Sequence, residues 1–225
     1  MEIPMYEKMR LLPLLQGLDS VAFDGILKFI KLDFNKFHAG DTFIREGDPC
    51  DRLVYIIDGE YEIDFRAQDV ELMVTERSAD VPHLVETYNL FSVQRNYERT
   101  YTFHSDGATF QIGRNVFVHK LLKYDVIRNN LINYACNQMR KQSEKKQIYT
   151  PCTVEGKIVQ CLLSYCTLDS GYKNFRIKML TLADMIKETR LNVSKVLNGW
   201  QDKGLIRMRR NGFETEDIKL LIAEQ

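Results

Sequence analysis

The feature that most constrains the fold is a run of short strand-like segments between residues 31 and 112. Apolar and polar residues alternate within these segments, and turns at Gly40-Asp41 and Gly47-Asp48 separate them. The segment RLVYIIDGEYEIDF reads as two strands joined by a hairpin at Asp58-Gly59. Many short strands with closely spaced turns are typical of an antiparallel sandwich or barrel. We therefore expect a β-rich domain over residues 1–114, with short helices at its start within residues 6–30.

The hydrophobic period changes after this domain. From about Asn115 to Gln147, apolar residues recur at spacings of three and four, which predicts a long amphipathic helix. Its apolar positions are Phe117, Leu121, Tyr124, Val126, Leu131, Ala135 and Met139. This stripe either packs on the β-rich domain or forms a two-helix seam in a homodimer, and the length of the helix favours the seam. We assign residues 115–149 to a dimerisation helix that ends before Thr150-Pro151.

Residues 150–225 predict a winged helix-turn-helix. Met179 to Ile186 forms one short helix, and Thr189 caps a second helix directly after it. The small side chain of Ala183 allows the two helices to cross closely. The inward residues of the second helix are Val193, Val196, Leu197 and Trp200. Lys187 stands where such a turn usually prefers glycine, so we expect it in the left-handed conformation.

The outward side of the second helix is polar. The candidate DNA-binding residues are Thr189, Arg190, Leu191, Asn192, Ser194, Lys195 and Asn198, together with Arg209 and Arg210 in a basic hairpin wing that turns at Asn211-Gly212. An α-helix enters the major groove, where Arg190 can grip guanine and Asn192 can grip adenine. Thr189 and Ser194 suit phosphate contacts.

Charge supports an anionic partner for this segment. The whole chain has 31 basic and 31 acidic residues, but the segment from Ile186 to Gly212 has seven basic and two acidic residues. Its net charge of about +5 favours a phosphate backbone. The alternative for the helix pair is a structural role without nucleic acid.

The order of these parts resembles the catabolite-activator/FNR (CRP/FNR) family of bacterial transcription factors over nearly the whole chain. HAGDTFIREGDPCDRLVYIIDGEYEI resembles the first part of the family's cyclic-nucleotide-binding barrel, a jelly roll. GKIVQCLLSY resembles the first helix of its DNA-binding domain, and LADMIKETRLNVSKVLNGWQDKGLI is close to its recognition signature. The resemblance puts Thr189 at the family's cap, Arg190 at its base-reading arginine and Lys195 at a second basic contact. Leu191 stands where the family often has glutamate.

The resemblance implies an α+β fold and an allosteric homodimer that regulates transcription. Its partner would be a palindromic site in double-stranded DNA, and its control would come from a small-molecule effector in the barrel. RNA polymerase would be a further partner if the protein activates transcription, although no motif marks a contact patch for it.

The sequence does not identify the effector that the resemblance implies. The candidate effector-binding residues are Glu86, Thr87, Arg99, Thr100, Gln142 and Ser143. Family members that bind cyclic nucleotides have a glycine-glutamate pair, followed later by arginine and serine or threonine. Arg99-Thr100 matches the second half, but Glu86-Thr87 stands where glycine-glutamate belongs. Without the glycine, backbone amides approach a phosphate less easily, which argues against cyclic AMP. We expect an unidentified effector or none, and a salt bridge from Arg99 to a carboxylate such as Glu86 or Glu98 is the alternative to anion binding.

Other functions have little support in the sequence. No cysteine cluster precedes Cys50, the four histidines are scattered, and no zinc spacing, phosphate loop or nucleophile–base pairing stands out. We therefore expect no enzyme and no metal site, and the residues identify no cofactor with certainty. The five cysteines are odd in number and scattered, which indicates a cytoplasmic protein, and the longest apolar runs are strand-sized, which excludes a membrane span. The remaining alternative is a ligand-binding signalling protein whose cyclic-nucleotide-binding-like domain controls a C-terminal part that does not read DNA sequence.

Overall fold

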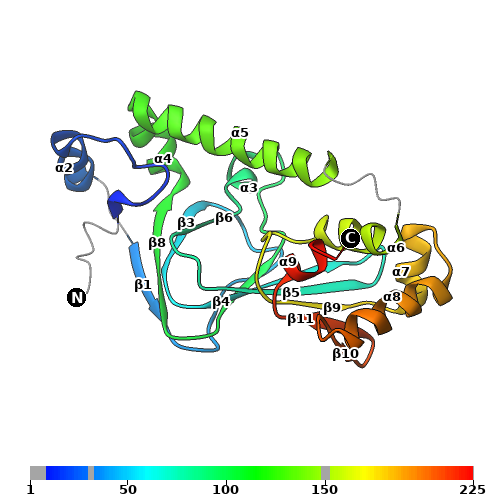
Figure 1. Cartoon of the computed structure of the whole chain (residues 1–225). Helices are drawn as coiled ribbons and strands as arrows, with labels where there is room; N and C mark the ends of the chain where they lie inside the picture. Colours follow the sequence, from blue (N-terminus) through cyan, green and yellow to red (C-terminus); the bar gives the residue numbers. More distant parts are fainter. Residues whose placement is uncertain (1–8, 30–32, 148–152, 225) are drawn as a thin grey trace. The chain divides into compact units, whose positions relative to one another are not determined.

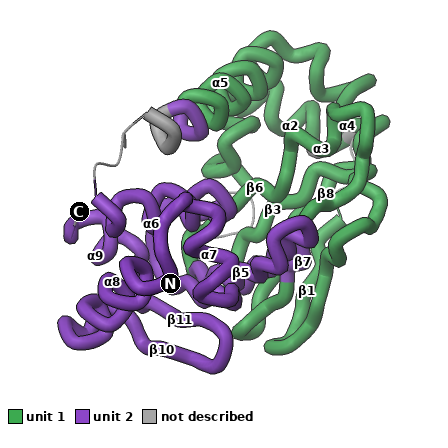
Figure 2. The backbone as a smooth tube through the Cα atoms, turned by 90° about the vertical axis from the view of Figure 1, so that its right-hand side faces the viewer, with its two compact units in different colours: residues 1–61, 79–98, 102–140 green, residues 62–78, 99–101, 141–225 purple. Residues whose placement is uncertain are grey.

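The computed structural model describes residues 9–29, 33–147 and 153–224. It has a mixed α+β architecture of antiparallel sheets and helices (Figure 1). The described residues divide into two compact units (Figure 2). The first unit lies within residues 1–61, 79–98 and 102–140, and the second lies within residues 62–78, 99–101 and 141–225. Among the described helices, none is both long and apolar enough to span a membrane.

The first unit is built on a four-stranded antiparallel sheet in the order β1-β8-β3-β6. Its elements are α2 (Ser20–Phe29), β1 (Asp33–Phe37), β2 (Thr42–Ile44), β3 (Arg52–Asp58), β6 (His83–Val85), α3 (Thr87–Phe91), β8 (Gly107–Gly113), α4 (Arg114–Lys120), a 3-10 turn η1 (Leu121–Lys123) and most of α5 (Asp125–Gln147). Strand β7 (Thr100–Phe103) contributes residues to both units. Strand β3 carries five consecutive buried apolar residues, so it is covered on both faces. Tyr55 on β3 lies opposite Phe110 on β8, and their rings stack at 5.9 Å.

The hairpin predicted at Asp58-Gly59 is wrong. The next strand, β4 (Tyr61–Ala67), does not pair with β3, because β3 pairs with β6 and β8 and the two strands belong to different sheets. Gly59 has φ +92°, and a Cβ there would lie 2.7 Å from the carbonyl oxygen of Asp106. The Asp58-Gly59 turn is therefore a corner in close contact with the Asp106 backbone, and only glycine fits there.

The long helix predicted over residues 115–149 is also corrected. The chain forms α4 and η1 first, Tyr124 is extended, and α5 begins at Asp125. Phe117, Leu121 and Ile127 are all buried. The break at extended Tyr124 separates the segment that buries Phe117 and Leu121 from the helix that buries Ile127. Val126, predicted to be in the apolar stripe, is exposed instead, and residues 148–149 lie outside the described residues.

The second unit contains the C-terminal helices and a sheet in the order β10-β11-β9-β5-β4. Its further elements are β5 (Leu72–Ser78), α6 (Val154–Leu163), β9 (Lys173–Arg176), α7 (Met179–Ile186), α8 (Arg190–Asp202), β10 (Arg207–Arg209), β11 (Gly212–Thr215) and α9 (Ile218–Ile222). Its core includes Val74, Ile158, Leu162, Phe175, Leu182, Val193, Leu197, Trp200 and Phe213. Residues 62–78 thus belong to the same compact unit as the C-terminal residues, although they lie early in the sequence.

Strands β5 and β9 form the antiparallel pair that joins these distant segments. Val74 lies opposite Phe175, and Glu76 lies opposite Lys173. Lys173 Nζ is 2.9 Å from Glu76 Oε2, and their side chains are 0% and 1% exposed. The Glu76 carboxylate also accepts hydrogen bonds from the backbone N–H groups of Thr167 (2.6 Å) and Leu168 (2.9 Å). A buried ion pair with these additional hydrogen bonds ties residues 62–78 to the segment between α6 and β9.

Candidate nucleic-acid interface

The connection between α7 and α8 has the predicted geometry. Ala183 is buried, and α7 ends at Lys187 in the left-handed conformation with φ 55°. The N–H of Glu188 donates to the carbonyl of Ala183 at 3.0 Å, which closes the end of the helix. The left-handed conformation of Lys187 that the sequence predicts is therefore confirmed, in spite of its cost in a residue with a Cβ.

The start of α8 is fixed by Thr189. Its Oγ1 accepts a hydrogen bond from the N–H of Asn192 at 3.2 Å, which satisfies a donor that the helix leaves open. Val193, Leu197 and Trp200 are buried, whereas Val196 is half-buried. The core thus orients α8 and leaves its other side exposed.

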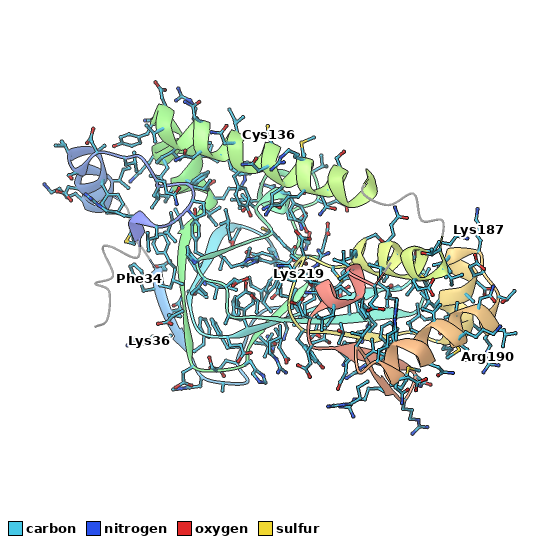
Figure 3. All side chains as sticks on the ribbon, in the orientation of Figure 1. Phe34, Lys36, Cys136, Lys187, Arg190 and Lys219 are labelled. Carbon is cyan, nitrogen blue, oxygen red and sulfur yellow. The ribbon has the colours of Figure 1, made fainter. Side chains whose placement is uncertain are left out.

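The candidate DNA-binding residues of α8 differ in exposure. Arg190, Leu191, Lys195 and Asn198 are exposed, and Asn192 and Ser194 are half-buried. Figure 3 shows Lys187 and Arg190 at the outer end of the α7–α8 pair. Basic and amide side chains are therefore presented together at the first turns of a helix whose N-terminus is exposed, an arrangement that suits an anionic ligand.

Asn192 has an internal partner that the sequence does not reveal. Its Nδ2 donates to Glu188 Oε2 at 3.1 Å, and Glu188 also forms an ion pair with Lys157 on α6. The hydrogen bond from Lys157, followed by that from Asn192, holds the pKa of the Glu188 carboxyl below its usual value. This bond joins Asn192 to Glu188 near the start of α8 and uses one N–H of the amide.

The β10–β11 hairpin carries the other basic candidates. Arg209 Nη2 donates to Glu214 Oε1 at 2.6 Å, and Arg207 lies 3.3 Å from the same oxygen. The hydrogen bond from Arg209 is the main cause that lowers the pKa of the Glu214 carboxyl. Arg210 is exposed next to Asn211, which has φ 63°. Arg209 is therefore oriented by a carboxylate, and Arg210 extends from the turn.

The structure places two further basic residues beside the predicted Arg209 and Arg210. Arg176 and Lys178 line a groove of about 700 Å³ together with Arg209 and Arg210. Ile177 between them is buried, so the alternation of basic and apolar residues just before α7 was the available signal.

The six candidate effector-binding residues are divided between the units. Glu86 and Thr87 lie in the first unit, and Arg99, Thr100, Gln142 and Ser143 lie in the second. Glu86 is buried with φ 31°, and its Oε2 accepts from Asn89 Nδ2 and from the N–H of Glu98, both at 2.8 Å. The Arg99 guanidinium lies 4.6 Å from the ring centroid of Phe65, and Gln142 and Ser143 are exposed. Neither unit by itself brings the six together.

Within residues 9–29, 33–147 and 153–224, no group of three or more His, Cys, Asp and Glu side chains is arranged to hold a metal ion. Cys50, Cys136, Cys161 and Cys166 are free thiols. Burial raises the pKa of the Cys50 and Cys161 thiols to about 11 in each case.

Comparison with known proteins identifies the fold of the chain through solved structures and not through its sequence. No protein-family model matches the sequence, and no curated protein is similar to it in sequence. Among solved structures, the catabolite activator protein of Thermus thermophilus is 16% identical, with a TM-score of 0.50 over 93% of this chain and 96% of that chain. A CRP/FNR-family transcriptional regulator from Eubacterium rectale is 15% identical, with a TM-score of 0.53 over 94% of this chain and 97% of that chain. Over nearly its whole length, this chain has the fold of the CRP/FNR-family regulators.

Proposed function

We propose that the chain is a sequence-specific DNA-binding transcription regulator of the CRP/FNR type, and not an enzyme. In this proposal residues 1–114, apart from residues 62–78 that join the second unit, form a jelly-roll barrel, residues 115–149 carry the dimerisation helix, and residues 150–225 form a winged helix-turn-helix. The observation that carries the proposal is the α7–α8 pair, in which buried Val193, Leu197 and Trp200 turn an exposed polar side outward. The partner is double-stranded DNA in the cytoplasm.

In this proposal α8 reads the major groove. Arg190 and Asn198 contact base edges, and Lys195 and Arg210 contact phosphates. Thr189, Asn192 and Ser194 complete the interface near the start of the helix, and Arg209 lies on the backbone beside it. The exposure of Arg190, Lys195 and Asn198 supports these roles.

Helix α5 supports a homodimer. Ile132 and Met139 are exposed, although they are large apolar side chains, and Cys136 is exposed between them. Spacings of four and three place these residues along one side of α5, and Figure 3 shows Cys136 on that helix. Pairing of two such helices would cover the stripe and present two recognition helices to a palindromic site. Half-sites one DNA turn apart require a separation of about 34–36 Å.

An unidentified small molecule, rather than a cyclic nucleotide, controls the dimer in this proposal. The sequence supports this choice, because Glu86-Thr87 stands where nucleotide-binding members have the glycine-glutamate pair. RNA polymerase is the further partner for activation.

The test is selection of bound duplexes from a random DNA pool, with the full chain and with Arg190→Ala and Lys195→Ala. We expect a two-fold symmetric site. Arg190→Ala should lose roughly 1–3 kcal/mol of specific binding and relax the preference at one position in each half-site. Lys195→Ala should weaken binding to all sequences and reduce its salt dependence. Recovery of no preferred sequence, with and without cell extract as a source of effector, would favour the signalling protein that does not read DNA.

A further inference from the structure

Leu191 is the most exposed leucine among the described residues, with 65% of its surface accessible. It lies in the first turn of α8, next to Arg190. The other exposed residues of that side are polar, so Leu191 is an isolated apolar side chain on the face that is proposed to meet DNA.

The geometry of α8 puts Leu191 near the middle of its outward side. Successive residues of an α-helix are about 100° apart, and buried Val193, Leu197 and Trp200 define the direction of the core. Leu191 lies roughly 150° from the centre of that buried face, close to the direction of Lys195 one turn later. Arg190 and Asn192 lie nearer the edges of the face. Leu191 thus projects further from the core than either of its neighbours.

In the major groove, an exposed leucine can pack against one kind of apolar group. Every group that the base edges display there is a hydrogen-bond donor or acceptor, except the C5-methyl group of thymine. A leucine cannot donate to a phosphate or to a base. We infer that Leu191 is a specificity-determining residue that packs on the methyl group of a thymine in each half-site, an inference that rests on the proposed function.

The neighbours of Leu191 support this role. The Asn192 side chain is half-buried and donates to Glu188 at 3.1 Å, so it extends less freely from the helix than Leu191 does. Lys195 follows at the i+4 position and can hold the adjacent phosphate or base. Leu191 therefore lies in the centre of the exposed side, with the polar contacts of its neighbours on either side.

The experiment removes the methyl group from the DNA and leaves the protein intact. The full chain binds the duplex selected from the random pool, and each thymine of one half-site is replaced in turn by 2′-deoxyuridine. The same duplexes are measured with Leu191→Ala and with the control Leu220→Ala, which removes an exposed leucine from α9.

We expect one thymine whose replacement weakens binding of the unmodified chain roughly three- to tenfold, the effect of one buried methyl group. Leu191→Ala should be insensitive at that position, and Leu220→Ala should remain sensitive. The inference is overturned if no thymine of the half-site shows the effect, or if Leu191→Ala is as sensitive as the unmodified chain. If the selection yields no preferred duplex, the proposed function is wrong. The inference about Leu191 is then wrong too, because it rests on that function.

Discussion

Replacement of Glu76 by glutamine tests whether the buried ion pair holds the second unit together. Glu76→Gln keeps the shape of the side chain but leaves the Lys173 ammonium, which is 0% exposed, with the carbonyl of Ser170 at 2.8 Å and no carboxylate. The backbone N–H groups of Thr167 and Leu168 also lose a charged acceptor. Removal of one partner from a buried ion pair costs about 3–5 kcal/mol. That is a large fraction of the ~5–15 kcal/mol by which folded proteins are stable.

Urea unfolding followed by tryptophan fluorescence measures this loss. Trp200 is the only tryptophan in the chain, and it is buried in the same unit as the ion pair. With a urea dependence of ~1–3 kcal/mol per molar, the midpoint should fall by about 2 M. The matched control is Glu71→Gln, which breaks the ion pair between Glu71 and Lys178. The Glu71 side chain is 69% exposed and the Lys178 side chain is 66% exposed. The control should leave the midpoint almost unchanged, because water and salt screen exposed pairs. Equal midpoints for Glu76→Gln and Glu71→Gln would refute the structural role of the buried pair.

Two further predictions concern the α7–α8 turn and the β10–β11 hairpin. Lys187→Gly should raise the free energy of unfolding by about 0.5–1 kcal/mol, because glycine adopts the left-handed conformation without a Cβ clash. Thermal unfolding measures this change. The control is Gly204→Ala, which should lower the melting temperature because Gly204 has φ +72°. The Glu214 carboxylate has its pKa lowered from 4.5 by the hydrogen bond from Arg209, so its stabilising contribution is present above about pH 4.5 and is lost as the pH falls through the folded-state pKa. Glu214→Gln should therefore show a smaller fall in the urea midpoint between about pH 5 and about pH 3 than the unmodified chain, and an equal fall would contradict the assignment.

The helix pair was predictable because its determinants are local. The cap at Thr189, the left-handed Lys187 and the inward spacing of Val193, Leu197 and Trp200 all lie within one short segment, and the structure has each of them. The strand-rich character of residues 31–112 was predictable for the same reason, since alternation and turn residues act over a few positions.

The errors come from contacts between distant segments. The break at Tyr124 and the start of α5 at Asp125 are not specified by the local periodicity, because apolar residues recur on both sides of the break. Glu76 and Lys173 look like ordinary surface charges in the sequence, and only the β5–β9 register makes them opposite neighbours. The corner at Gly59 depends on the close approach of the Asp106 backbone. Side-chain hydrogen bonds such as Asn192 to Glu188 also depend on the folded arrangement.

The pairing of β5 with β9 has a consequence for protein engineering. A chimera that transplants residues 150–225 onto another sensor would leave β9 as a bare sheet edge, with Phe175 deprived of Val74 and Lys173 deprived of its counter-charge. Bare edges of this kind promote association between chains. A soluble chimera should therefore carry residues 62–78 as well, so that the portable module is discontinuous in sequence.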